Sequence, residues 1–206
     1  LAMMGLCRDR GWHPAGAVVT GIVFAFGASA AWRIQHIGQV QSYAFFAIAL
    51  WLLLRTLDRS SVRYGILTGL AAGAMVVEPD QVALLGIYIL AAFTIGHWWR
   101  VDWDTGWLRR NIGPLAAAAG AGLIIVAVPL LLTTLYALSS NRPSIDFAEA
   151  VRGALHPASL LTAVIGDLYG ALDPKVAYWG PYSEAWDARE LFLSQNMGQV
   201  YLGALP

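Results

Sequence analysis

Two short polar turns, each lying between long apolar segments, carry most of the side chains that could do chemistry. The first covers residues 32–40 and the second covers residues 78–81. The candidate site residues in and directly after these turns are Arg33, His36, Gln39, Gln41, Glu78, Asp80 and Gln81. Polar groups beside a hydrocarbon layer cost insertion free energy and are kept mostly where they have a task. We therefore expect the two turns to lie side by side and to form the floor of one polar site.

Four side chains of this set suit substrate binding: Arg33, His36, Gln39 and Gln81. The planar guanidinium of Arg33 can pair with a phosphate or diphosphate. The imidazole of His36 can donate a hydrogen bond to the same anion or move a proton. The amides of the glutamines suit sugar hydroxyls. These residue types suit phosphate and sugar groups, and by themselves they leave the ligand open.

The two carboxylates, Glu78 and Asp80, are the catalytic candidates. Either one could act as a general base or help to hold a divalent cation. We assign no residue as a metal ligand, and no other cofactor is indicated. The alternative for each of these polar residues is that it caps a helix end and sits in interfacial water.

The composition predicts a helical membrane protein. Of the 206 residues, 58% are hydrophobic and only 13% are charged, whereas about a quarter are charged in an average soluble domain. Several apolar runs approach the ~20 residues that span a bilayer. The formal net charge of zero gives no indication of a nucleic-acid partner, and the single Cys7 can form no internal disulfide.

Residues 1–138 predict a transmembrane bundle of about five spans. The expected spans are residues 14–31, 41–57, 64–77, 82–98 and 112–138. The third is short, and its Gly65, Gly69 and Gly73 recur at four-residue spacing. Small residues at this spacing predict a tightly packed or partly re-entrant helix. In the last span, Pro129 is expected to introduce a kink.

Residues 139–206 predict an extracytoplasmic segment of short helices that leads into a further span. Asp146 is placed where a helix could begin. Leu160, Leu161, Val164, Ile165 and Leu168 mark one apolar helix face, which suits a helix lying on a membrane or on the bundle. The apolar runs at both ends of the sequence lead us to expect a fragment of a longer protein.

The distribution of arginines predicts how the chain crosses the membrane. Alternate turns carry Arg8, Arg10, Arg55, Arg59, Arg63, Arg100, Arg109 and Arg110. Arginine-rich loops face the cytoplasm, so the polar turns and residues 139–206 should face outside. Asp9 and Asp58 are expected to pair with neighbouring arginines. The Asp102-Trp103-Asp104 run, although a familiar metal-binding pattern in soluble glycosyltransferases, is interpreted as a solvated interfacial loop.

The order of these features resembles the YfhO-like bacterial membrane proteins, which belong with the GT-C type glycosyltransferases. The resemblance rests on the Ala-Ala-Trp-Arg-Ile-Gln-His-Ile-Gly-Gln-Val-Gln-Ser-Tyr-Ala-Phe-Phe run at 30–46 and the Leu-Trp-Leu-Leu-Leu-Arg run at 50–55. It continues with a glycine-rich helix and polar turn at 73–81. It extends to Ser-Asn-Arg-Pro at 140–143 and Tyr-Leu-Gly-Ala-Leu-Pro at 201–206.

This resemblance implies a transferase that moves a sugar from a polyprenyl-phosphate donor at the outer face of a bacterial cytoplasmic membrane. Its implied partners are membrane lipid and the lipid-linked donor. His36 and Gln39 match the family pattern, and Arg33 matches it less closely. The family often has a histidine near the proline where this chain has Glu78-Pro79-Asp80. Its catalytic acidic residue lies in an N-terminal outer loop that this sequence lacks, so the resemblance does not identify the base.

Two non-enzymatic alternatives are a transporter or flippase-like protein and a structural membrane subunit. A transporter is expected to place polar or charged groups at mid-membrane depth. Here the expected spans are almost free of charge, and the polar residues lie at their ends. This pattern favours a site that faces the membrane surface. The sequence does not indicate an oligomeric state.

Overall fold

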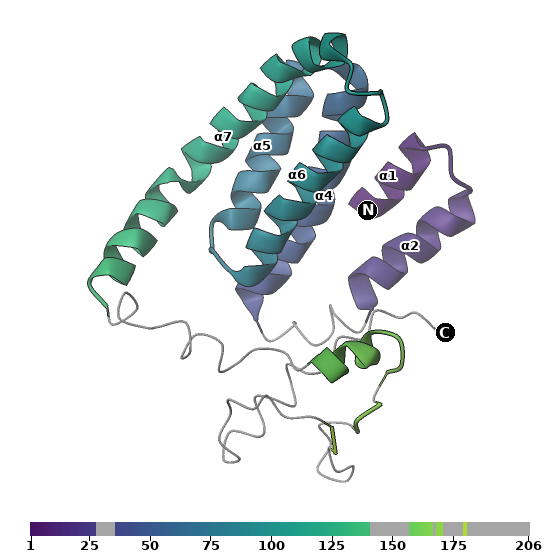
Figure 1. The fold of residues 1–206 in the computed structure, drawn as a ribbon, viewed down its shortest axis with the longest axis vertical. Coiled ribbons are helices and arrows are strands. Elements are labelled where there is room, and N and C mark those ends of the chain that lie inside the picture. The colour runs from purple at the N-terminus through teal and green to yellow at the C-terminus, as the bar shows by residue number, and fades with distance from the viewer. Residues whose placement is uncertain (28–35, 141–156, 167, 171–178, 181–206) are drawn as a thin grey trace. The chain divides into compact units, whose positions relative to one another are not determined.

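A computed structural model describes residues 1–27, 36–140, 157–166, 168–170 and 179–180, and all regular structure in these residues is helical (Figure 1). The helices are α1 (Ala2–Asp9), α2 (Pro14–Phe26), α4 (Ile37–Arg59), α5 (Val62–Val76), α6 (Gln81–Trp99), α7 (Thr105–Leu138) and the 3-10 helix η3 (Pro157–Ala163). The expected all-α class is therefore confirmed. The chain divides into two compact units, the first formed by Leu1–Ala25 with Arg33–Tyr136 and the second by Phe26–Trp32 with Ala137–Pro206.

Three helices of the first unit, α4, α6 and α7, are long and apolar enough to cross a membrane. They match three of the five expected spans. The other two expected spans form the shorter apolar helices α2 and α5, and residues 28–31 of the first lie outside the described residues. Helix α2 begins at Pro14, where the missing N–H of proline costs no hydrogen bond.

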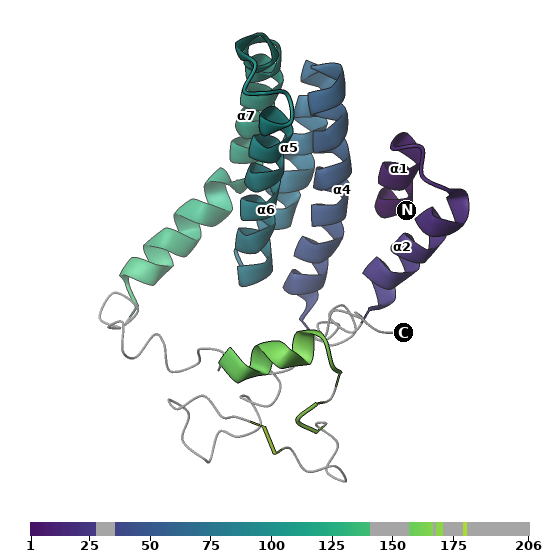
Figure 2. The same cartoon turned by 45° about the vertical axis from the view of Figure 1, so that its right-hand side comes forward.

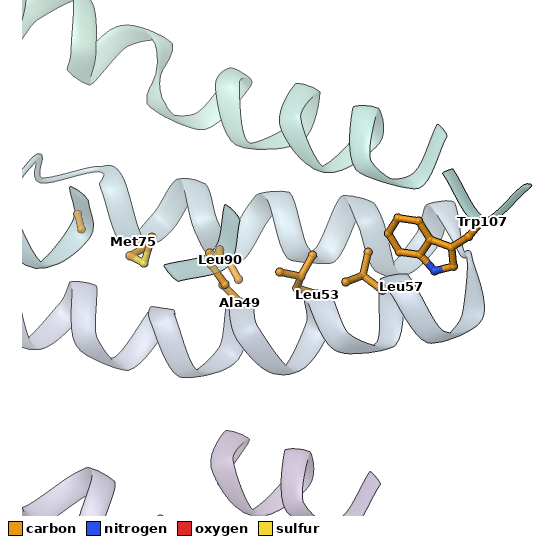
Figure 3. Packing of buried hydrophobic residues seen from close by; sticks show 8 residues of the cluster. Ala49, Leu53, Leu57, Met75, Leu90 and Trp107 are labelled. Carbon is orange, nitrogen blue, oxygen red and sulfur yellow. The ribbon is translucent and has the colours of Figure 1, made fainter. Parts of the chain in front are cut away.

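Helix α4 is the centre of the first unit and packs against α1, α5 and α6 (Figures 1 and 2). Its buried residues Ala49, Leu53 and Leu57 form one core with Met75 of α5 and Leu90 of α6 (Figure 3). Between α4 and α5, the hydroxyls of Thr56 and Thr68 lie 2.9 Å apart and are buried. Helix α7 contributes Trp107 to this core near its start, whereas its most apolar stretch is almost wholly exposed. Such an exposed apolar surface suits contact with lipid.

The three glycines of α5 bring α7 into backbone contact. A Cβ placed on Gly65 would meet the carbonyl oxygen of Pro114, and one placed on Gly69 would meet that of Ala118. A Cβ on Gly73 would lie 2.9 Å from Cβ of Ile125. The expectation of a tightly packed helix is confirmed. Helices α5 and α7 therefore run parallel, because the residue numbers of the contacts increase together along the two helices.

The arginine-rich turns gather at one end of the first unit. Arg10 Nη2 lies 3.3 Å from Asp58 Oδ2, which joins the turn after α1 to the end of α4. His97 Nε2, near the end of α6, lies 3.9 Å from Asp58 Oδ1. Arg55 Nη2 donates to Asp9 Oδ1 at 3.0 Å. Both aspartates therefore pair with arginines, but the expectation that these would be neighbouring arginines is wrong, because the partners are remote in sequence and meet only where helices pack.

The Asp9–Arg55 pair predicts an acid-sensitive contribution to stability. Its hydrogen bonds lower the pKa of Asp9 from 3.8 to about 2. The contribution is thus present above pH 3.8 and is lost as the pH falls through about 2. Each pKa unit is worth about 1.4 kcal/mol, and partial solvent exposure reduces the total to about 1–2 kcal/mol. Acid titration of the unfolding free energy in neutral detergent should show this loss, and Asp9→Asn should remove it. An identical acid limb in Asp9→Asn would contradict this assignment.

The second unit is described at η3 and a few residues around Tyr169. The helix expected to carry an apolar face through Leu168 is replaced by the 3-10 helix, which ends at Ala163. Leu160 and Leu161 are both exposed. The hydroxyl of Tyr169 donates to the carbonyl oxygen of Ala158 at 2.9 Å, a bond that folds the chain back onto η3. The helix start expected at Asp146 lies outside the described residues.

Candidate functional site

The first turn of α4 and the turn after α5 lie side by side, as the polar residues predicted. Gln41 Nε2 donates to the carbonyl oxygen of Ala74 at 3.1 Å. One residue further on, the buried Ser42 Oγ donates to the carbonyl oxygen of Met75 at 2.9 Å. These carbonyls belong to the last turn of α5 and have no partner further along their helix. The two bonds therefore close the end of α5 and hold the 78–81 turn against α4.

Asp80 is engaged as a helix cap. Its Oδ1 accepts a hydrogen bond from the backbone N–H of Ala83 at 2.7 Å, the usual geometry of an N-cap on α6. Its Oδ2 lies 3.3 Å from Ser42 Oγ. Ser42 has one hydroxyl proton, so Oδ2 competes for it with the closer carbonyl oxygen of Met75. The capping alternative accounts for Asp80, and a role as general base would require it to leave the cap.

Glu78 is exposed and approaches the first turn of α4. Its carboxyl group lies where a Cβ on the buried Gly38 would stand, so the two residues are in close contact and a larger residue at position 38 would displace this carboxyl group. The first N–H groups of a helix carry partial positive charge and attract anions. Glu78 therefore places a carboxylate beside the electropositive end of α4.

The remaining candidates surround the same place. His36 is exposed at the N-cap position of α4, and its side chain makes no cap hydrogen bond. Gln39 is half-buried in the first turn of α4, and Gln81 is exposed at the first position of α6. Arg33 lies outside the described residues.

Ser42 is the site residue that sequence reasoning missed. It joins both turns, because its hydroxyl contacts the end of α5 and the cap of α6. In the sequence it is one small hydroxyl at the start of an apolar run, directly after Gln41. That signal is weak, since serine and threonine also bond to their own helix backbone in apolar helices. Its role follows only from the contact between helices.

The arrangement offers polar groups and little capacity for a preformed metal site. In the part of the chain that the structure describes, no group of three or more His, Cys, Asp or Glu side chains could hold a metal ion. The carboxylate of Glu78 and the imidazole of His36 can instead exchange protons or bind a ligand by hydrogen bonds.

The Asp102-Trp103-Asp104 run at the arginine-rich end is a helix cap. Asp104 accepts hydrogen bonds from the backbone N–H groups of Gly106 at 2.9 Å and Trp107 at 2.7 Å, which begin α7. These two bonds lower the pKa of Asp104 below its ordinary value. The structure thus accounts for Asp104 without a ligand, in agreement with the interfacial-loop interpretation.

No family model, curated protein or solved structure matches this chain.

Proposed function

We propose that this protein transfers a sugar from a polyprenyl-phosphate donor and binds the donor at the polar end of its helical bundle. The observation that supports this proposal is the contact between the first turn of α4 and the 78–81 turn. This contact brings together the N-termini of the apolar helices α4 and α6, with His36 and Glu78 at the first and Gln81 at the second. A polar headgroup beside a hydrocarbon surface matches the two halves of a lipid-linked sugar.

The transfer itself is a displacement at the anomeric carbon. An acceptor hydroxyl oxygen bonds to that carbon, the bond from the carbon to the phosphate oxygen breaks, and the polyprenyl phosphate leaves with the electron pair. The acceptor proton passes to a general base. In this proposal His36 and Arg33 stabilise the leaving phosphate, and Gln39 and Gln81 hold sugar hydroxyls. Glu78 is the carboxylate that lies near the reacting centre, and Asp80 positions the turn.

The orientation in this proposal follows from the arginines. The arginine-rich turns lie at one end of the first unit and are joined by the Arg10–Asp58 contact. The positive-inside rule places that end in the cytoplasm of a bacterial cell. The candidate site then opens at the outer face of the cytoplasmic membrane. A reporter enzyme fused after Arg59 should be active in the cytoplasm, and an extracytoplasmic signal would overturn this orientation.

The buried polar groups support the transporter alternative less well than the transferase proposal. The hydroxyls of Thr56 and Thr68 lie 2.9 Å apart, and each is also within hydrogen-bond distance of a carbonyl oxygen one turn back in its own helix. Since each hydroxyl has one proton, one threonine donates to the other and the second donates to its own helix. Such satisfied hydroxyls are typical of packing between membrane helices. Among the described residues no charged side chain is buried. A substrate path through the bundle would require polar groups that remain available at mid-depth.

The test is the loss of sugar transfer in Arg33→Ala and His36→Ala. Each variant should abolish glycan modification in membranes that contain normal amounts of the protein, because the leaving phosphate loses a charged or hydrogen-bonding partner. Arg8→Ala and His13→Ala remove the same residue types at the arginine-rich end and should retain transfer. Transfer at the wild-type rate in both Arg33→Ala and His36→Ala would refute the assignment of the donor site.

A further inference from the structure

Helix η3 carries its side chains in the reverse of the usual order for a surface in water (Figure 1, green). Its apolar side chains lie outside, since Leu160 is 58% exposed, Leu161 is 56% exposed and Val164, directly after the helix, is 54% exposed. Its polar side chains lie inside, since Ser159 and Thr162 are each only 1% exposed. In water, large aliphatic side chains are mostly buried and hydroxyls are mostly exposed. The reversed order indicates an apolar environment on the outer side of η3.

The geometry of a 3-10 helix places the exposed side chains on one continuous surface. With three residues per turn, side chains three positions apart lie in line. Ser159 and Thr162 form the buried line, along which Thr162 Oγ1 donates to the carbonyl oxygen of Ser159 at 2.6 Å. Leu161 and Val164 form the second line, and the N–H of Val164 donates to the carbonyl oxygen of Leu161 at 3.1 Å. Leu160 begins the third line beside them, so these two leucines and the valine form one apolar patch, called the η3 patch.

An exposed indole is attached to the same helix through Tyr169. Tyr169 is buried, and its hydroxyl donates to the carbonyl oxygen of Ala158 in η3 at 2.9 Å. The N–H of Trp179 donates to the carbonyl oxygen of Tyr169 at 2.9 Å, and the two rings pack edge to face with their centroids 5.2 Å apart. Trp179 itself is 67% exposed. Because tryptophan is enriched at the depth of lipid headgroups, this indole indicates the same environment as the η3 patch.

The bilayer is the apolar partner that the connectivity of the chain supplies. Helix α7 is long and apolar enough to cross a membrane, and it ends at Leu138. The long segment of the second unit begins at Ala137, so the chain enters this unit where α7 leaves the hydrocarbon layer. Residues 157–165 contain no charged side chain that would pair with a protein partner or with a particular headgroup. A short helix with one apolar side suits the boundary between headgroups and acyl chains.

We propose that the η3 patch inserts into the boundary between the lipid headgroups and the acyl chains and holds the second unit on the membrane surface. The partner is the hydrocarbon of the lipid, so binding does not depend on the charge of the headgroup. With the arginine-rich end in the cytoplasm, this boundary belongs to the outer leaflet. The inference goes beyond the proposed sugar transfer and stands without it, because it uses no residue of the candidate site.

Quenching of a fluorophore at position 164 tests this proposal with the full chain in phosphatidylcholine nanodiscs. Cys7→Ala removes the native thiol, and Val164→Cys then provides the position for labelling. A nitroxide lipid labelled near the headgroup should quench this fluorophore more than one labelled near the end of the acyl chain, because such helices lie ~5–10 Å into the boundary. Iodide in the water should quench it weakly. The same label at Arg8→Cys, in the exposed last turn of α1, should be quenched strongly by iodide and weakly by the nitroxide lipids.

Leu160→Asp/Leu161→Asp should move the label at position 164 into water. Each leucine is about half exposed, so its insertion supplies about half of the free energy of burying a whole leucine. Replacing both should shift the equilibrium of η3 from the membrane toward water roughly 30-fold. Quenching by iodide should therefore rise, and quenching by the nitroxide lipids should fall.

Two further double variants separate insertion from a loss of folding. Leu160→Met/Leu161→Met keeps the patch apolar and should retain the wild-type quenching. Leu160→Ser/Leu161→Ser removes the apolar side chains without adding charge and should behave like the aspartate variant. Thermal unfolding in neutral detergent should stay near the wild-type temperature in all of these variants, because both leucines are exposed.

Three results would each overturn the proposal. Iodide quenching at position 164 as strong as at position 8 would show that the patch lies in water. Protection from both iodide and nitroxide lipids would show that protein covers the patch, and loss of a dimer in Leu160→Asp/Leu161→Asp on size-exclusion chromatography would identify that protein as a second copy. A folded aspartate or serine variant with the wild-type quenching would show that the leucines do not hold η3 in the membrane.

Discussion

Gly69→Leu should leave little folded protein, with a loss of about 3 kcal/mol or more in the free energy of unfolding. The backbone carbonyl of Ala118 in α7 occupies the space that even a Cβ on Gly69 would need. Backbone cannot move aside as a flexible side chain can, so α7 must separate from α5. The reverse contact repeats this geometry, because a Cβ on Gly122 would lie 3.2 Å from the carbonyl oxygen of Gly69. Thermal unfolding in detergent and size-exclusion chromatography would measure the effect.

The matched control is the same substitution on α7. A Cβ at Gly120 would meet nothing within 4 Å, so Gly120→Leu adds the same side chain to an open surface. We expect its unfolding temperature to stay close to the wild-type value. Gly69→Ala should be intermediate. If Gly69→Leu and Gly120→Leu unfold at the same temperature, α5 and α7 are not packed as the structure describes.

Glu78→Gln should reduce sugar transfer about 100-fold or more, whereas Asp80→Asn should retain most of it. General acid–base catalysis contributes roughly 10²–10⁴-fold to a rate, and glutamine removes the titrating group with little change in shape. Asparagine is as good an N-cap as aspartate. It therefore preserves the bond from Ala83 N–H that Asp80 accepts in the structure. Rates of transfer in membranes, normalised to the amount of folded protein, would measure both variants.

The control is the free energy of unfolding of variants at the same two residues. Asp80→Ala removes the cap of α6 and should lower the free energy of unfolding by about 1 kcal/mol, while Glu78→Gln should unfold near the wild-type temperature. The assignment of Glu78 as the base and Asp80 as the cap would be wrong if Asp80→Asn folds but is inactive while Glu78→Gln remains active. A proposal of transferase activity would then place the base at Asp80.

The helices of the first unit could be predicted from residue type alone, because apolar runs of sufficient length have few other stable structures in a bilayer. The tight packing of α5, although not its contact with α7, was indicated by Gly65, Gly69 and Gly73, whose spacing places them on one helix face. The partner residues Pro114 and Ala118 were not predictable, since many small residues in α7 would serve equally well. The helix expected through Leu168 failed because helical periodicity does not reveal where a chain tightens into a 3-10 turn.

Within the candidate site, the two carboxylates show the limit of sequence reasoning. Glu78 and Asp80 are two residues apart and have similar chemistry, so the sequence does not distinguish their roles. The structure separates them, because Asp80 is bound by Ala83 N–H and Ser42 while Glu78 approaches the N-terminus of α4. This difference arises from contacts with residues of another helix, which sequence distance does not reveal.

The sequence by itself determined that this is an all-helical protein with apolar helices, polar turns at one set of helix ends and arginines at the other. These properties depend on composition and order along the chain, and a hydrocarbon environment leaves the backbone few alternatives. Only the tertiary structure decided which polar side chains form hydrogen bonds within the protein. Hydrogen bonds such as those of Ser42 form between residues that are distant in sequence, and they exist only after α4, α5 and α6 have packed together.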